Sequence, residues 1–319
     1  MSPTINGTAA QIQEMLEYYD GYIVKGENPH TIARVKLENV SITFYTTNTI
    51  LFQGKSELAE YNIWAKRFNL PLEDEAESVY EQYQNLTAIG CDEVGTGDYF
   101  GPVVVCSCYV RSDQIEELKH LGVKDSKLLM DDLIINLALK LKNIVKYSIL
   151  ILSPEKFNAL HKPEENNLNF IKACLHNNAI NSLISKLDGE KYDAILIDEF
   201  TTREKYFHYL RKLQNVEQNV VLIPKGERVH VAIAAASILA RAAFLKSMND
   251  LSRLVKTDLI KGAGRLVDQQ AVGLIKSYGT SILDKIAKRK FVNTERILQY
   301  CHDNNIKVVE HRDSSNNED

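Results

Sequence analysis

Short apolar runs alternate with helical stretches through the middle of the sequence. The runs have the length and β-branched content of buried strands. They lie at Ala88–Cys91, Val103–Val110, Val145–Leu152, Ala194–Ile197 and Val220–Ile223. Such alternation is typical of a sheet covered by helices. Because a short glycine loop joins the first two runs, they should form an antiparallel hairpin. The pattern therefore predicts an α/β domain with a mixed sheet flanked by helices.

The first 68 residues follow a different pattern. A helical stretch, Thr8–Tyr18, precedes three short alternating or β-branched segments within residues 31–54. Apolar residues at helical spacing in Ser56–Phe68 then predict a helix over this small sheet. We expect a small α+β domain at 1–68, a linker at 69–86, a main domain with C-terminal helices at 87–301, and a tail at 302–319 that is largely disordered at its end. Within the main domain, the small apolar residues of 229–249 predict a helix packed closely against the sheet.

Composition limits the class of protein. The chain is 45% hydrophobic and 25% charged, as is ordinary for a soluble protein, and no apolar run approaches the roughly 20 residues of a membrane span. The polar, acidic beginning lacks the pattern of a secretory signal, so we expect a cytoplasmic protein with reduced cysteines. Because the formal net charge is −4, nucleic-acid binding would have to come from local basic patches.

Acidic pairs follow two of the apolar runs. Asp92 and Glu93 come after the first run, and Asp198 and Glu199 after the fourth. A carboxylate there costs desolvation unless it is solvated, hydrogen-bonded or bound to a cation. Either pair alone could be a solvated strand end or a helix cap, but two pairs in equivalent settings favour a metal site. Mg²⁺ and Mn²⁺ prefer oxygen ligands and combine carboxylates with substrate phosphate, so a phosphate ester is the expected substrate.

The loop between the first two runs contains Gly95, Gly97 and Gly101. It resembles a nucleotide-binding glycine loop, but such loops need a helix directly after them. Here a strand, Val103–Val110, follows Pro102. The glycines therefore favour close backbone approach to a ligand. The alternative is that they serve only the turn.

Two lysine-containing segments precede helices. Lys127 lies in "VKDSKLL", and Lys225 precedes Glu227 ahead of the small-residue helix. A lysine beside a helix N-terminus can contact phosphate. The simpler alternatives are that Asp125 or Ser126 caps a helix and that Glu227 is an ordinary first-turn acid.

These motifs together resemble the type 2 ribonuclease H family, and most closely its ribonuclease HIII branch. "DEVGTGDYFGP", "KDSK", "ILIDEF", "KGE" with "AAASILAR", and "KGAG" occur in the family's order over roughly residues 87–297. The loop sequence Gly95-Thr96-Gly97, in place of Gly-Arg-Gly, and a glutamate as the fourth acid favour the HIII branch.

The resemblance implies a ribonuclease H-like fold and a TATA-binding-protein-like domain at residues 1–68 that grips the substrate. It also implies that the catalytic acids and metal ligands are Asp92, Glu93, Asp198 and Glu227. Glu199 becomes a neighbour, although strand-end position alone ranks it above Glu227.

The implied activity is cleavage of the RNA strand of RNA–DNA hybrids with two Mg²⁺ or Mn²⁺ ions, leaving 5′-phosphate and 3′-hydroxyl ends. The candidate substrate contacts are Gly95, Thr96 and Gly97 for the 2′-hydroxyl and Lys127 and Lys225 for phosphate. Threonine in place of arginine predicts a preference for runs of ribonucleotides over a single one. We expect a monomer. The alternatives are junction-type ribonuclease HII activity, a non-catalytic hybrid-binding protein, and a nuclease of the same fold that acts on DNA.

Overall fold

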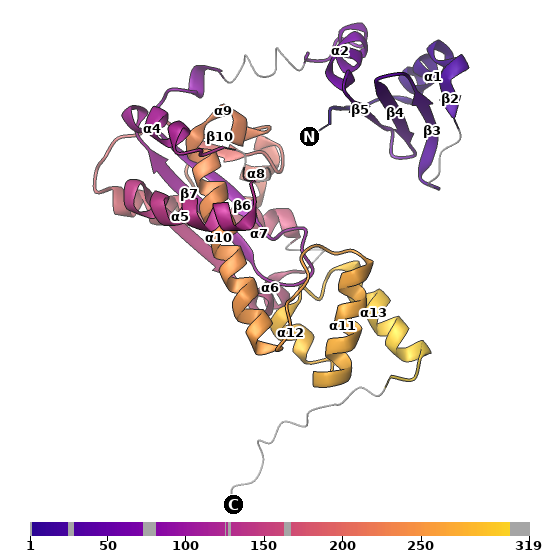
Figure 1. Ribbon diagram of the computed structural model, residues 1–319. Coiled ribbons are helices and arrows are strands. Elements are labelled where there is room, and N and C mark those ends of the chain that lie inside the picture. Colours follow the sequence, from indigo (N-terminus) through magenta and orange to yellow (C-terminus); the bar gives the residue numbers. More distant parts are fainter. Residues whose placement is uncertain are drawn as a thin grey trace, which may run out of the picture. The chain divides into compact units, whose positions relative to one another are not determined.

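The computed structural model describes residues 2–24, 29–72, 81–124, 126, 129–162 and 167–306. The chain divides into two compact units, Met1–Gln82 and Tyr83–Asp319 (Figure 1). Residues 73–80 of the expected linker and 307–319 of the expected tail lie outside the described residues.

The first unit is an antiparallel sheet with two helices, as the sequence predicts. Its strand order is β1-β5-β4-β3-β2. The three predicted segments form the central strands, whereas the short edge strands β1 and β2 were not predicted. Phe44, Phe52 and Trp64 are fully or almost fully buried in its core. The elements are β1 (Thr4–Asn6), α1 (Ala9–Tyr18), β2 (Ile23–Val24), β3 (Thr31–Lys36), β4 (Val40–Tyr45), β5 (Thr49–Gly54) and α2 (Glu57–Arg67).

The second unit contains the predicted mixed sheet, with strand order β10-β9-β6-β7-β8. The hairpin of β6 and β7 is antiparallel, as expected, and β8 extends it in the same sense. On the other side of β6, β9 and β10 are parallel to it. The strands are β6 (Ala88–Val94), β7 (Val103–Val110), β8 (Lys146–Leu152), β9 (Ala194–Asp198) and β10 (Val220–Ile223).

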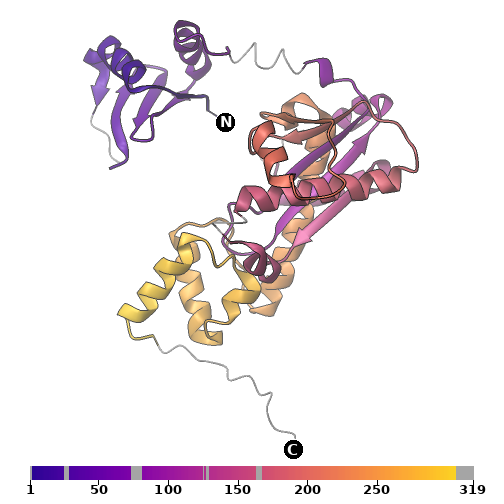
Figure 2. The ribbon, with the colours of Figure 1, turned by 180° about the vertical axis from the view of Figure 1, so that it is seen from behind.

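Helices cover both faces of this sheet. α10 (Val231–Leu254) crosses one face (Figure 1), and α7 (Leu168–Leu187) covers the other, which is turned to the viewer in Figure 2. A side chain at Gly90 would collide with the backbone of Ala232, so the strand and helix backbones are in direct contact. The remaining helices are α4 (Ile115–His120), α5 (Asp131–Ile144), α6 (Pro154–Leu160), α8 (Arg203–Leu210), α9 (Gly226–Val229), α11 (Arg265–Tyr278), α12 (Ile282–Ile286) and α13 (Val292–Asp303).

α10 corrects two expectations. The helix expected at 229–249 is broken at His230, whose backbone is extended, and it continues to Leu254. By length and composition alone α10 could also cross a membrane, contrary to the expectation that no apolar run is long enough. However, 67% of its most apolar window is buried inside the unit, where the helix packs on β6 and β7. Packing against the sheet therefore accounts for its apolar composition.

Candidate metal centre

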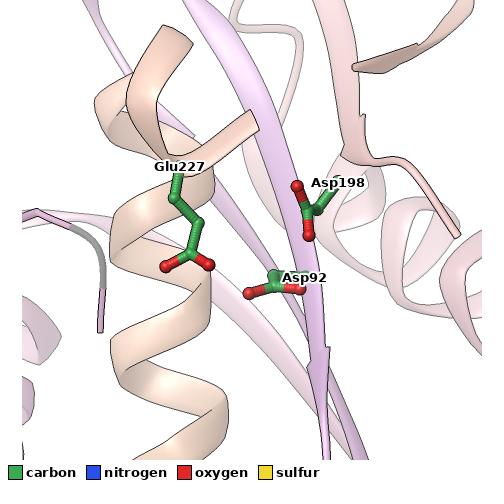
Figure 3. A group of neighbouring side chains, drawn as sticks. All are labelled: Asp92, Asp198 and Glu227. Atoms are coloured by element: carbon green, nitrogen blue, oxygen red, sulfur yellow. The ribbon is translucent and has the colours of Figure 1, made fainter. Parts of the chain in front are cut away.

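Three carboxylates from three elements meet at one point of the second unit. Asp92 lies on β6, Asp198 ends β9, and Glu227 lies in α9. One oxygen of each carboxylate lies within 4.8 Å of the others, and Figure 3 shows the three groups turned toward one another. Asp92 is 5% exposed and Glu227 8% exposed. The sequence-predicted acids Asp92, Asp198 and Glu227 are thus brought together.

The alternation of side chains along β6 decides which acid enters the group. The strand continues to Val94, so the Asp92-Glu93 pair lies inside the strand rather than after it, as the sequence had suggested. Successive residues of a strand point to opposite faces. Ile89 and Cys91 pack in the core beneath α7, whereas Gly90 abuts α10. Asp92 therefore lies on the α10 face and Glu93 on the α7 face.

The same rule selects Asp198 over Glu199 in β9. Ile195 and Ile197 pack in the core beneath α7, so Asp198 lies on the α10 face, like Asp92. β9 is parallel to β6 and hydrogen-bonded to it, which brings their C-terminal ends side by side. Glu199 stays outside the three-carboxylate group, and burial raises its pKa.

A tight turn after β10 delivers Glu227. Lys225 adopts a left-handed backbone with φ of 53°, a conformation that is uncommon for a non-glycine residue and concentrates at functional sites. The next amide, of Gly226, donates to Asp198 Oδ1 at 2.8 Å. Glu227 Oε2 in turn accepts from the Ser126 amide at 3.0 Å. Asp92 Oδ1 likewise accepts from the Glu93 amide at 2.7 Å, so backbone amides fix all three carboxylates.

Like charges make this group unfavourable without a cation. Burial raises the pKa of Asp92 well above its ordinary value, and the charges of Glu93, Asp198 and Glu227 raise it further. An all-oxygen donor set of this kind fits a hard divalent cation such as Mg²⁺ or Mn²⁺. Asp92, Asp198 and Glu227 are the residues that would hold it.

Glu93 is held elsewhere. Its Oε1 lies 2.5 Å from Lys172 Nζ, and its Oε2 lies 2.8 Å from His176 Nε2, both on α7. Burial alone raises the pKa of Glu93, but the hydrogen bond from His176 and the Lys172 charge bring it below its ordinary value. The Phe200 ring stacks on His176 at 5.2 Å between centroids and contacts the Lys172 ammonium at 4.3 Å. The structure does not place Glu93 in the three-carboxylate group.

A cavity of about 380 Å³ opens over Asp92 and Asp198, and the glycine loop forms part of its wall. Gly95 serves the turn, because its φ is 91° and a side chain would collide with the Pro102 carbonyl. Gly97 has no such need: its φ is not left-handed, and a Cβ there would meet no atom within 4 Å. The turn therefore explains Gly95 but leaves Gly97 open to a ligand. The cavity is lined by Asp92, Glu93, Val94, Gly95, Thr96, Gly97, Asp98, Ser126, Asp198, Ser237 and Arg241.

Sequence reasoning missed part of this lining. Ser237 Oγ lies 2.8 Å from Ser126 Oγ, and Arg241 donates to the Ser126 carbonyl and, at 2.8 Å, to Asp131. The signal was present in "AAASILAR", because residues four apart share one helix face.

The two predicted phosphate contacts have different outcomes. Lys127 lies outside the described residues. Lys225 lies between β10 and α9 as the N-cap of α9 and is not among the residues that line the cavity.

Comparison with known proteins agrees with this architecture. The sequence profile of the family "Ribonuclease HII" matches residues 89–294, and a "Domain of unknown function (DUF3378)" matches residues 5–77. A Ribonuclease HIII of Geobacillus sp. is 42% identical over 296 residues, which are 92% of this chain and 96% of that protein. One of Bacillus cereus is 39% identical over 306 residues, 93% of this chain and 98% of that protein.

A solved structure extends the likeness to three dimensions. The crystal structure of Bst-RNase HIII in complex with Mn²⁺ has a TM-score of 0.68 and 35% identity, and the match covers 94% of this chain and 99% of that one. The chain therefore belongs to the ribonuclease HII family, in its ribonuclease HIII branch.

Proposed function

We propose that this protein is an endoribonuclease that cleaves the RNA strand of RNA–DNA hybrids with Mg²⁺ or Mn²⁺, giving 5′-phosphate and 3′-hydroxyl ends. The observation that carries the proposal is the convergence of Asp92, Asp198 and Glu227 within 4.8 Å, beneath a cavity bordered by a glycine loop. The Mn²⁺ complex of Bst-RNase HIII supports the choice of cation.

The proposed site uses four acids in two ways. Asp92, Asp198 and Glu227 hold the cation, and Asp92 is central because its pKa responds to all the other acids. Bound divalent cations supply charge neutralisation at the phosphate and a water of lowered pKa. Glu93 completes the set from the cavity wall, where Lys172 and His176 fix its carboxylate. Amide donors to Asp198 and Glu227 keep those carboxylates aimed at the cation before substrate arrives.

Selection of RNA requires contact with the 2′-hydroxyl, which DNA lacks. The backbone of Gly95, Thr96 and Gly97 is the proposed reader, because it borders the cavity and Gly97 leaves open space beside it. Lys127 and Lys225 are the proposed phosphate contacts, and the unit Met1–Gln82 is the proposed hybrid-gripping domain. With Thr96 in the loop, runs of ribonucleotides should be preferred over a single one.

The test is digestion of end-labelled duplexes that contain one, four or many consecutive ribonucleotides, in Mg²⁺ and in Mn²⁺. An all-DNA duplex and the D92N variant serve as controls. We expect cleavage of four or more ribonucleotides, slow cleavage at a single one, and none of DNA. Efficient cutting at a single ribonucleotide indicates junction-type activity, cutting of DNA indicates a different nuclease, and binding without cleavage indicates a non-catalytic protein.

We further propose that the protein acts as a cytoplasmic monomer. A hybrid is a nucleic-acid substrate inside the cell, and the proposed carboxylate set comes from a single chain. Light scattering of the purified protein, alone and with a hybrid, tests the monomer, and cell fractionation tests the compartment.

A further inference from the structure

The far side of the glycine loop is held by a distant C-terminal segment. Besides the bonds of the Lys288 side chain, three backbone hydrogen bonds and one bond from an amide to a carboxylate join them. They are Tyr99 N–H to Gly262 O at 2.8 Å, Gly101 N–H to Ile286 O at 2.9 Å, Lys288 N–H to Tyr99 O at 2.8 Å, and Gly262 N–H to Asp98 Oδ1 at 2.5 Å. Residues just beyond the cavity wall are thus fixed by a segment far along the chain.

Lys288 makes the most unusual of these contacts. Its side chain is 0% exposed, and its ammonium donates to the carbonyls of Gly101 at 2.6 Å and Phe100 at 3.4 Å. The Phe291 ring centroid lies 5.7 Å away. Burial lowers the pKa of Lys288 to about 7, and the Asp98 charge opposes that change. Since a buried ammonium is costly, a methionine would fill this position more cheaply if packing alone were needed.

The loop requires such an anchor. β6 ends at Val94 and β7 begins at Val103, so the pairing of β6 with β7 does not hold the intervening residues. Their backbone partners come from the C-terminal segment, where Phe100 pairs with Ala287. Glycines lose more backbone entropy on ordering than other residues, so a glycine loop is costly to hold in one conformation. A loop that positions substrate must be held closely, because a displacement near 1 Å can lower the reaction rate by a large factor. A fixed contact on Gly101 therefore restrains a segment that its own sequence leaves loose.

We propose that Lys288 is a positioning residue for ribose recognition: by holding the carbonyls of Phe100 and Gly101, it fixes the backbone of Gly95–Gly97 against the 2′-hydroxyl. The proposal rests on the proposed function of that loop. It assigns the C-terminal segment a part in choosing RNA over DNA, through the loop rather than by touching substrate.

The experiment compares the full-length wild type with K288M and K288Q. The substrates are an RNA–DNA hybrid and the same hybrid with 2′-fluoro replacing the 2′-hydroxyl at single positions around the cleaved bond. The discrimination ratio is the kcat/KM for ribose divided by that for 2′-fluoro. Thermal unfolding and Mn²⁺ binding by calorimetry report on the fold and the metal site, which lie outside the proposed effect.

For K288M we expect unchanged Mn²⁺ affinity, a KM higher by about tenfold, and a discrimination ratio lower by about tenfold. Glutamine keeps a neutral NH2 donor group on a shorter stem, so the discrimination ratio of K288Q should fall by only about two- to threefold. A merely structural lysine would lower activity on both substrates equally. If K288M or K288Q folds and keeps the discrimination ratio of the wild type, the inference is overturned. If the wild type itself does not cleave the hybrid, the proposed function is overturned instead.

Discussion

Lys172 Nζ lies 2.5 Å from Glu93 Oε1, on the face of the sheet opposite the one that carries Asp92. Two acids that are adjacent in the sequence therefore have different partners. The Lys172 ammonium balances the charge of Glu93, whereas the neighbours that most affect the pKa of Asp92 are other acids. Of these two adjacent acids, only Asp92 needs an added cation to balance its charge.

The first prediction follows from this division. D92N should weaken Mn²⁺ binding by at least about 100-fold and abolish cleavage, because it removes the charge of the central carboxylate. E93Q should change Mn²⁺ affinity by less than about fivefold, since Lys172 and His176 already engage both oxygens of Glu93. Calorimetric titration of each variant measures the two affinities. Equal losses in D92N and E93Q would place Glu93 among the ligands of the first cation.

The second prediction separates the two roles of the glycine loop. G95A should lower the free energy of unfolding by about 1–3 kcal/mol, because φ is 91° and the Cβ would collide with Pro102. G97A should leave stability nearly unchanged, since its Cβ would meet open space. G97A should nevertheless raise the KM for a hybrid severalfold by filling the space beside the ribose. Denaturant unfolding and steady-state kinetics check the pair; a stable G97A with wild-type KM would contradict the ligand role of Gly97.

The third prediction concerns acid stability. His230 is 1% exposed; its Nδ1 accepts from the Ala232 amide and its Nε2 faces the Leu86 carbonyl. Burial lowers the pKa of His230 from 6.5 to about 4. The unfolded state therefore takes up a proton between pH 6.5 and 4 that the folded state refuses. The contribution of neutral His230 to the free energy of unfolding is fully present above pH 6.5. It falls by about 3 kcal/mol as the pH drops to 4.

H230N is the matched control for this effect, because asparagine can still cap α10 but does not titrate. Denaturant unfolding of wild type and H230N between pH 7.5 and 4.5 isolates the histidine from the carboxylates that titrate in both. The difference in free energy of unfolding between wild type and H230N should shrink or reverse as the pH falls. A constant difference would show that His230 does not titrate in this range.

The sequence predicts the strands that are almost entirely apolar. Val103–Val110 and Val220–Ile223 have the bounds observed for β7 and β10, because a polar residue lies at one end of each run and a proline, Pro102 or Pro224, at the other. The sequence predicts that β6 ends at Cys91, because the next two residues are acids and a pair of polar residues is typical of a turn. Pairing with β7 overrides that local preference. β1 and β2 are too short to show any periodicity.

The site was less accessible to sequence reasoning. β9 is buried on both faces, so its residues show no alternation that would separate Asp198 from Glu199. Side chains alternate along the strand, so Asp198 points to the face opposite Ile195 and Ile197. This alternation selects Asp198 only once α7 is known to cover the face that carries the two isoleucines. The position of Glu227 depends on the left-handed turn at Lys225, a conformation that the backbone propensity of lysine does not favour. The family resemblance supplied it instead.

The last prediction concerns the cation and the fold together. A ligand that binds only the folded state stabilises it by RT ln(1 + [L]/Kd), about 2.7 kcal/mol at 100 times Kd. Mn²⁺ should therefore raise the thermal midpoint of the wild type by several degrees, and a chelator should reverse the shift. Because the carboxylates repel one another, D198N should be at least as stable as wild type without metal, yet should lose most of the Mn²⁺ shift. A shift that survives in D198N would mean that the ion binds elsewhere on the chain.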